Sequence, residues 1–216
     1  MFYLDSADRT QLAPLLATGL FAGVTTNPTI LHRAGLSSAD LPDLLAWVRE
    51  HGVNRFYAQA TGRTVDELRA AAASIAKLGD DVVTKFVATQ AALTVAKEQV
   101  DAGRQVLITA VYHPSQALLA AAAGAHEIAP YVGRATEQGR DGIALVSAVA
   151  RIAPDVRVLA ASLRSPDQVA AVAAAGAHDV TVSTAVASAV LEDSLTLTAA
   201  DEFEDIVATA RHEATV

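Results

Sequence analysis

The sequence contains no cysteine and only three lysines, and both shortages narrow what the protein can do. Without cysteine the chain has no disulfide, no thiolate metal ligand and no thiol nucleophile. Its 16 basic residues face 24 acidic ones, which gives a formal net charge of -8. No cluster of lysine and arginine interrupts this acidic balance, so no nucleic-acid partner is expected.

Long apolar runs and leader-like segments are also missing. The longest stretch without a charged residue, 10–31, contains Pro14, Asn27 and Pro28, which is not typical of a membrane span. At the N-terminus no basic region precedes a long apolar stretch, which argues against a signal peptide. We therefore expect a cytoplasmic protein without a membrane partner.

Recognisable cofactor motifs are absent as well. The six histidines are scattered, and no two of them stand two or four residues apart, as metal ligands often do. The sequence has no GxGxxG, no Walker loop and no GxSxG. These absences predict chemistry without a metal, a nucleotide or another cofactor.

Short apolar runs alternate with helical patterns along the whole chain of 216 residues. The runs are continuous rather than alternating, which is typical of parallel strands covered on both faces. Strands are expected over 2–5, 21–25, 55–60, 82–88, 105–111, 127–132, 156–162 and 179–183. Helices are expected between them, with one beginning at Ser38 and an extra C-terminal helix over about 199–212. Residues 26–29 and 133–139 are expected to form loops.

Eight strand–helix repeats in one chain predict an α/β fold, a (β/α)8 TIM barrel forming a single domain over 1–216. An open, doubly wound sheet is the alternative, because periodicity does not reveal whether a sheet closes. In a barrel the active site lies at the C-terminal ends of the strands. The residues at those ends are therefore the candidates for function.

Lys85 stands out because it interrupts the apolar strand expected over 82–88. Lys77 and Lys97 lie in helical patterns, where a charged side chain reaches water. Burying an ammonium group is costly, so a buried lysine tends to lose its proton and becomes a nucleophile towards carbonyl carbon. The simpler interpretation is a lysine at a strand end whose amino group reaches solvent.

Polar or ionisable residues finish seven consecutive expected strands. They are Asp5, Thr25 with Asn27, Gln59, Lys85, Thr109, Tyr131 and Ser162. With Lys85 as an imine-forming residue, Asp5 could orient the amine or carry protons, and Tyr131 could act as acid or base through a water held by Gln59 and Thr109. Each residue also has a purely structural interpretation, such as capping a helix or satisfying the backbone.

A second set of residues suits an anion. Ser162 ends a strand, and Ser165-Pro166 is typical of a helix start, where backbone N–H groups favour phosphate. Arg164 lies in this segment, and Arg134 follows Tyr131 by three residues, so both could donate paired hydrogen bonds to phosphate. Both could equally be ordinary surface arginines.

These segments together resemble the transaldolase-like class I aldolases, most nearly the fructose-6-phosphate aldolase type. The resemblance covers nearly the whole chain in order and rests on segments 4–6, 23–29, 57–59, the strand of Lys85, 109–112, 129–134 and 158–162. The most specific parts are Thr25-Thr26-Asn27-Pro28 and Ala129-Pro130-Tyr131-Val132, followed two residues later by Arg134.

The resemblance implies a (β/α)8 barrel in which Lys85 forms the Schiff base. It further implies that Asp5, Thr25 and Asn27 line the dihydroxyacetone pocket. Gln59, Thr109 and Tyr131 would hold the catalytic water, and Arg134 with Ser162 would bind the phosphate. Members of this family also form homo-oligomers in which the C-terminal helix packs on a neighbour, which residues 199–211 could do.

Two positions favour an aldolase over a transaldolase. Transaldolases resemble one another in having glutamate at the end of the third strand and phenylalanine on the sixth, where this chain has Gln59 and Tyr131. A tyrosine hydroxyl could protonate the dihydroxyacetone enamine and release it. The chain departs from the family beside the lysine, where Phe86 and Val87 replace a small apolar residue and a proline.

The leading hypothesis is thus a lysine-dependent aldolase, an aldehyde-lyase of carbohydrate metabolism. Its expected partners are a dihydroxyacetone-type ketone and a phosphorylated aldehyde such as glyceraldehyde 3-phosphate. The first alternative is a transaldolase that transfers a dihydroxyacetone unit between sugar phosphates. The second is a non-catalytic sugar-phosphate-binding barrel in which Lys85 only pairs with an acid. A metal-dependent aldolase is disfavoured by the histidine spacing.

Overall fold

In the computed structural model, which describes residues 1–213, eight parallel strands close into a barrel in sequence order. The strands are β1 (Phe2–Asp5), β2 (Gly23–Thr25), β3 (Phe56–Gln59), β4 (Val82–Val87), β5 (Val106–Val111), β6 (Glu127–Pro130), β7 (Arg157–Ala160) and β8 (Asp179–Val182). Pairing of β1 with β8 completes the ring. The predicted (β/α)8 barrel is confirmed, and the open-sheet alternative is wrong.

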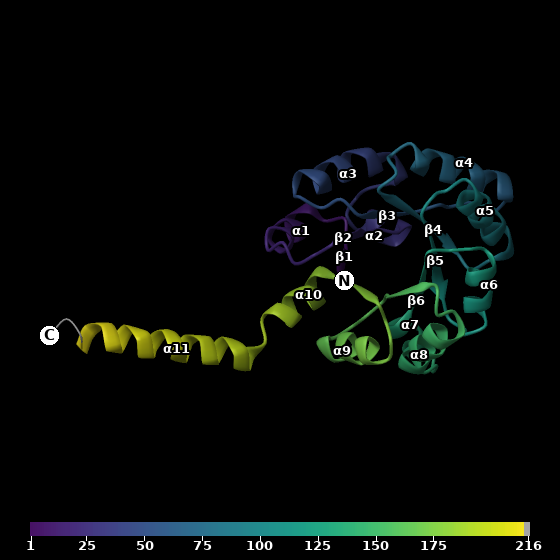
Figure 1. The fold of residues 1–216 in the computed structure, drawn as a ribbon. Helices are drawn as coiled ribbons and strands as arrows, with labels where there is room; N and C mark the ends of the chain where they lie inside the picture. The colour runs from purple at the N-terminus through teal and green to yellow at the C-terminus, as the bar shows by residue number, and fades with distance from the viewer. Residues whose placement is uncertain (214–216) are drawn as a thin grey trace.

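Helices surround the barrel and follow the strands (Figure 1). They are α1 (Arg9–Leu16), α2 (Pro28–Arg33), η1 (Ser38–Asp40), α3 (Leu41–Glu50), α4 (Val65–Ala76), α5 (Gln90–Asp101), α6 (Gln116–Ala122), α7 (Val132–Glu137), α8 (Gly142–Ile152), α9 (Pro166–Ala174), α10 (Thr184–Leu191) and α11 (Ser194–Glu213). Thr64 begins α4 with a capping box, in which its hydroxyl accepts from the Glu67 N–H at 3.2 Å.

Two segments that were expected to be loops are short helices. Asn27 caps α2, its Oδ1 accepting from the Ile30 N–H at 3.0 Å, and Pro28 is the first helical residue. Proline at this position has no N–H that the helix could use and is preset for helical geometry. The prediction took Pro28 only as the end of the preceding strand. Likewise α7 begins directly after Tyr131, where residues 133–139 were expected to form a loop.

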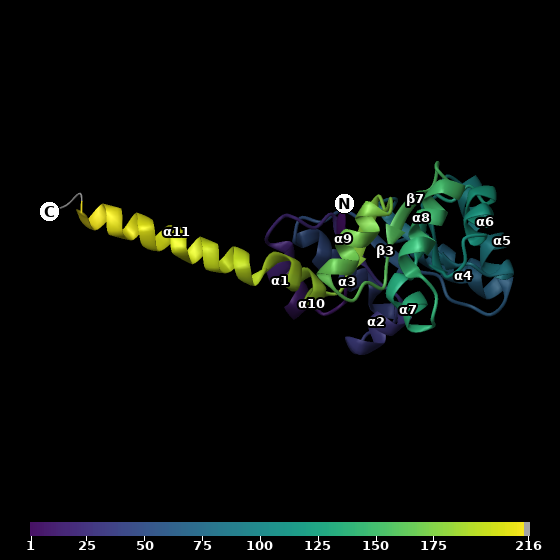
Figure 2. The same cartoon turned by 90° about the horizontal axis from the view of Figure 1, so that it is seen from below.

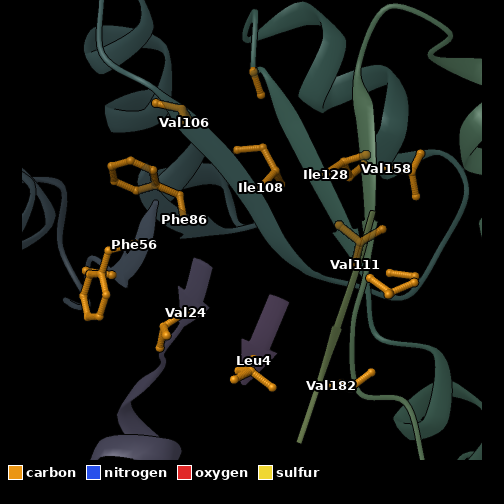
Figure 3. Packing of buried hydrophobic residues seen from close by; sticks show 14 of the residues in the cluster. Leu4, Val24, Phe56, Phe86, Val106, Ile108, Val111, Ile128, Val158 and Val182 are labelled. Atoms are coloured by element: carbon orange, nitrogen blue, oxygen red, sulfur yellow. The ribbon is translucent and has the colours of Figure 1, made fainter. Parts of the chain in front are cut away.

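Side chains alternate between the two faces of each strand. Leu4, Val24, Phe56, Phe86, Val106, Ile108, Val111, Ile128, Val158 and Val182 face the helices and are buried in the main core (Figure 3). A separate cluster, which includes Tyr3, Tyr57, Val83, Leu107 and Leu159, fills the inside of the barrel. The Tyr3 and Tyr57 rings meet edge to face with centroids 5.3 Å apart. The barrel interior is therefore packed below its open end.

Charged pairs close the N-terminal end of the barrel. Glu127 is buried, and its Oε1 accepts from the Arg55 guanidinium and from the Tyr57 hydroxyl. Buried Asp179 accepts from Nη2 of Arg157 at 2.8 Å. In TIM barrels, residues at the N-terminal end of the strands usually contribute to stability, and the active site lies at the C-terminal end. We therefore expect the functional site at the C-terminal end.

Helix α11 leaves the barrel after α10 and projects from it as a long arm (Figures 1 and 2). It begins five residues before the predicted start at 199 and ends at Glu213, close to the predicted end. Several large apolar side chains on it are exposed, with Leu195 at 79% and Ile206 at 66%. Among residues 1–213, no helix combines the length and apolarity that crossing a bilayer requires.

Candidate active site

A cavity of about 220 Å³ opens at the C-terminal ends of the strands. Nine of the ten predicted site residues line it: Asp5, Thr25, Asn27, Lys85, Thr109, Tyr131, Arg134, Ser162 and Arg164. A hollow of about 370 Å³ beside the barrel, between η1, α3 and α4, is larger but lined by no titratable residue. Titratable side chains therefore line the cavity at the mouth of the barrel and not the larger hollow beside it.

Lys85 lies on β4 with its side chain inside the barrel and only 5% exposed. Its Nζ donates to the backbone carbonyl of Thr26 at 2.8 Å. Among the described residues, no carboxylate lies within ion-pair distance of this nitrogen. Burial lowers the pKa of Lys85, and the more distant negative charge of Asp5 offsets this only in part. The amine thus combines burial, a lowered pKa and access to the cavity.

Asp5 is the last residue of β1, and its carboxylate accepts the first of two linked hydroxyl hydrogen bonds. The Thr25 hydroxyl donates to Oδ1 of Asp5 at 2.6 Å. Because that hydroxyl has one proton, its 2.6 Å contact with Thr181 requires Thr181 to be the donor. Burial raises the pKa of Asp5, while Lys85 and the Thr25 hydrogen bond act in the opposite direction. A carboxyl group with a raised pKa, close to the amine, is suited to proton transfer.

Tyr131 stands at the end of β6, outside the strand itself, and pairs with Ala161 through an isolated bridge. Its hydroxyl accepts from the Thr109 hydroxyl at 3.3 Å. Burial raises the pKa of Tyr131, and the Thr109 hydrogen bond lowers it to a smaller extent. The phenol is therefore protonated at neutral pH and can serve as an acid.

An irregularity in β5 follows directly after Thr109. The register between β5 and β6 shifts between Ile108 and Val111, and Ala110 has a φ of 54°. A left-handed conformation costs a residue other than glycine about 1–2 kcal/mol. Ordinary alternation after Leu107 and Ile108 turns Thr109 to the cavity, and the extra residue, Ala110, packs against the inner cluster. The bulge therefore lets Val111 return to the outer core directly after the mouth.

The opposite side of the cavity suits an anion. Gly133 donates its N–H to the Ser162 carbonyl at 2.9 Å, and the Arg134 N–H donates to the Ser162 hydroxyl at 3.2 Å. Ser162 itself has a φ of 62°, a strained conformation that turns its carbonyl and hydroxyl towards α7. Nε of Arg164 pairs with Glu137 at 2.9 Å. Two arginines and a serine are thus held together by backbone contacts between β6 and β7.

Gln59 is the predicted site residue that does not line the cavity. Its backbone is in register with that of Lys85, and alternation along β3 puts it on the inner face with Tyr57. Its side chain instead lines two hollows beside the barrel, near Ser38 and Leu41. Among residues 1–213 no hydrogen bond holds the Gln59 amide, and a long side chain at a strand end is not fixed by alternation alone.

Several lining residues were not predicted. Thr29, Ile30 and Arg33 come from α2, and Thr181 comes from β8. The spacing i, i+1, i+4 of the first three puts them on one face of a helix, but the sequence prediction had a loop over 26–29 and no helix over 30–33. Thr181 lies within β8 rather than at its end, so reading only strand ends missed it.

The family-model comparison covers nearly the whole chain: residues 2–215 match the model of the transaldolase/fructose-6-phosphate aldolase family. The chain belongs to this family. The resemblance inferred from the sequence is thereby confirmed.

Individual relatives agree with this assignment. The chain is 33% identical over 205 residues, 93% of each chain, to a protein named probable transaldolase from Caulobacter vibrioides. It is 33% identical over 199 residues, 90% of each chain, to a probable transaldolase of Chelativorans sp.. A probable transaldolase 2 of Bacillus anthracis is 34% identical over 191 residues, with 84% of this chain and 85% of the relative covered.

The departure from the family beside Lys85 leaves the lysine accessible. Phe86 points away from the cavity and is fully buried in the outer core (Figure 3). Alternation explains this, since neighbouring residues of a strand face opposite sides. Lys85 therefore lines the mouth, while Phe86 anchors β4 to the surrounding helices.

Proposed function

We propose that this transaldolase-family enzyme is a Schiff-base aldolase that uses Lys85. The observation that carries the proposal is a buried lysine in the central cavity, with a lowered pKa and no ion-pair partner among the described residues. An unperturbed lysine is neutral in only about one part in 10³ to 10⁴ at pH 7, so lowering its pKa is what makes it reactive.

The proposed reaction cleaves or forms one carbon–carbon bond. The neutral Lys85 amine attacks the carbonyl of a ketose phosphate, and loss of water gives an imine. The C4 hydroxyl then loses its proton and the C3–C4 bond, one bond removed from the imine carbon C2, breaks. This releases a phosphorylated aldehyde, and the electron pair of the broken bond forms the enamine on the protonated imine. Asp5 lies close enough to the amine to influence its pKa, which supports a role in these proton transfers.

Tyr131 is proposed to complete the cycle. Its phenol is protonated at neutral pH and lies in the cavity beside Thr109. It would protonate the enamine, directly or through a water held with Thr109, so that hydrolysis releases dihydroxyacetone. Gln59 would contribute to that water by rotating inwards from its position beside Lys85. Thr25 and Asn27 would bind the hydroxyl groups of the dihydroxyacetone part.

The substrate is proposed to be a sugar phosphate, such as fructose 6-phosphate in the cleavage direction. Arg134, Ser162 and Arg164 line one side of the cavity and suit a phosphate group. The products would be dihydroxyacetone and glyceraldehyde 3-phosphate.

A second candidate is a transaldolase that transfers the three-carbon unit to another sugar phosphate. It is favoured by the names of the curated relatives, which are called probable transaldolases. The aldolase is favoured by Tyr131, a donor inside the cavity that would release the enamine. The two reactions differ in their need for an acceptor. Without an acceptor sugar phosphate to take up the enamine, a transaldolase stops after one turnover, whereas an aldolase continues to release aldehyde.

The test is to measure glyceraldehyde 3-phosphate release from fructose 6-phosphate with and without erythrose 4-phosphate as acceptor. Multiple turnovers without the acceptor support the aldolase, and strict dependence on the acceptor supports the transaldolase. Lys85→Met should abolish either activity. A parent that binds fructose 6-phosphate without turnover, and still binds it as Lys85→Met, would be a non-catalytic barrel.

The protein is also proposed to form a homo-oligomer through α11. Phe203, Ile206 and Val207 follow the i, i+3, i+4 spacing of one helix face and are exposed by 65%, 66% and 41%. Burying such side chains stabilises an assembly by about 1.5–3 kcal/mol each. The arm projects from its own barrel (Figure 2), so a second copy is the partner we propose for this face.

A further inference from the structure

Arg33 is a cationic residue of the mouth that has no role in the proposed reaction. It lies in the last turn of α2 and lines the same cavity as Lys85. It also lines an adjoining hollow of about 210 Å³ between α2 and the loop after β8, formed with Ser183 and Thr184 among others. Arg33 therefore stands where the catalytic cavity widens towards solvent.

The backbone that carries Arg33 is well anchored. Asn27 caps α2, Pro28 starts it, and buried Leu31 attaches it to the core. Thr29 and Ile30 line the cavity together with Arg33, so one face of the helix is turned to the mouth. The position of Arg33 at the rim is thus set by the helix, while its guanidinium is exposed.

Arg33 differs from the other two arginines of the cavity in having no protein partner within the described residues. Arg164 pairs with Glu137, and the Arg134 guanidinium stacks on the Tyr131 ring at 5.3 Å from its centroid. A guanidinium without a partner keeps all five N–H donors available for a ligand. Exposed arginines are common, but this one is turned to the catalytic cavity.

The barrel topology places Arg33 across the mouth from the other two. It follows β2, whereas Arg134 follows β6, four strands further along a ring of eight. Helices α2 and α7 lie at the same end of the barrel (Figure 2). Besides Lys85, the lining contains three arginines and a single acid, Asp5, in a chain whose net charge is -8. Positive charge is thus concentrated where an anionic substrate would enter.

We propose that Arg33 is a third anion-recognition residue, which binds the phosphate of the incoming phosphorylated aldehyde or sugar phosphate from the rim opposite Arg134 and Arg164. The inference rests on the proposed function, because it assigns a specificity residue to the same site. Its distinctive consequence is that discrimination between phosphorylated and unphosphorylated substrates depends on α2 as well as on the β6 and β7 ends.

The test compares kcat/KM for glyceraldehyde 3-phosphate and for glyceraldehyde as acceptors, with dihydroxyacetone as donor. Arg33→Gln is expected to lower the ratio of these values about 10-fold, as loss of a charge-assisted hydrogen bond would. Arg33→Lys should restore part of the ratio, since lysine supplies the charge without the planar fork. Arg134→Gln is the positive control, with a lowered ratio expected.

Arg63→Gln is the matched negative control. Arg63 follows β3 and so lies at the same end of the barrel, is exposed, and lines neither the cavity nor the adjoining hollow. Arg63→Gln therefore removes one positive charge from the same end of the barrel without changing a residue that lines the cavity. If Arg33→Gln and Arg63→Gln give the same ratio, Arg33 contributes only to the general field, and the proposal is overturned.

A binding experiment separates this proposal from the proposed function. If the parent forms no product with either acceptor, the proposed aldolase function is wrong. Calorimetric titration with glycerol 3-phosphate then tests whether Arg33 binds an anion. A weaker Kd in Arg33→Gln than in Arg63→Gln supports anion recognition by Arg33. Equal Kd values in the two variants overturn it, whatever reaction the protein catalyses.

Discussion

Replacing Gly133 by alanine is expected to damage both the fold and the side of the cavity that Arg134, Ser162 and Arg164 line. A Cβ atom at this position would lie 2.2 Å from the Ser162 carbonyl oxygen and 2.9 Å from Cγ of Arg164. Carbon and oxygen atoms in contact are about 3.3 Å apart or more, so the two segments would separate by roughly 1 Å. The Gly133 N–H bond to Ser162, now 2.9 Å long, would then exceed hydrogen-bond range.

The size of the effect follows from the groups that lose their partners. Gly133 is buried, and an N–H left unsatisfied there costs about 1–3 kcal/mol, whereas water can replace Ser162 as partner of the exposed Arg134 N–H. Forcing an extra methyl group into packed surroundings costs about 1–3 kcal/mol more. We expect Gly133→Ala to lower the free energy of unfolding by about 2–4 kcal/mol. A displacement of about 1 Å at a positioning element can also cost about 10²-fold in rate, here mainly with phosphorylated substrate.

The assay is urea unfolding together with kcat/KM for a phosphorylated and an unphosphorylated acceptor. Gly139→Ala is the matched control, because Gly139 follows the same helix and a Cβ there meets no atom within 4 Å. Its φ of +75° makes backbone strain of about 1–2 kcal/mol the only expected cost. If Gly133→Ala is no more destabilised than Gly139→Ala and keeps its preference for phosphorylated acceptor, the steric reasoning is refuted.

Three further predictions concern proton transfer and assembly. Asp5→Asn removes the charge that raises the pKa of Lys85, so the limb of the kcat/KM against pH profile that reports Lys85 should move to lower pH. Loss of the proposed proton-transfer group should also lower kcat about 10²-fold. A limb that does not move would contradict this prediction. Thr109→Val removes the bond that lowers the pKa of Tyr131, so the limb on which the phenol loses its proton should move to higher pH in the same profile. Phe203→Asp should dissociate the proposed oligomer in sedimentation velocity, and an unchanged sedimentation coefficient would exclude α11 from the interface.

The barrel was predictable because its pattern repeats eight times. Each strand is a short apolar run, and its paired neighbours in the ring are its neighbours in sequence. Closure was not visible in the periodicity, since it depends on β1 pairing with β8 at the far end of the chain. The short helices α2 and α7 were missed because each has only six residues, too few to give a repeating apolar face.

The lining of the candidate site was predictable wherever a strand ends in a polar residue that faces inwards. Asp5, Lys85 and Thr109 were found in this way and line the cavity. The same reasoning did not place Gln59, because a flexible side chain at the rim can leave the inner face. Arg33 was missed because it reaches the cavity from a helix rather than from a strand end.

The backbone strain at the site was also hidden in the sequence. Ala110 and Ser162 adopt positive φ angles, although neither is glycine. Only the paired strands reveal that Ala110 occupies a bulge and that Ser162 meets the start of α7. Such conformations depend on tertiary contacts that sequence periodicity does not report.

The central claim is that Lys85 forms an imine with the substrate, and borohydride trapping tests it most directly. The protein is incubated with dihydroxyacetone and borohydride, digested, and mapped by mass spectrometry. We predict one added mass of reduced dihydroxyacetone on the peptide of Lys85, none on Lys77 or Lys97, and none in folded Lys85→Met. A folded parent protein that gains no mass at Lys85, or gains it equally at all three lysines, would contradict the account.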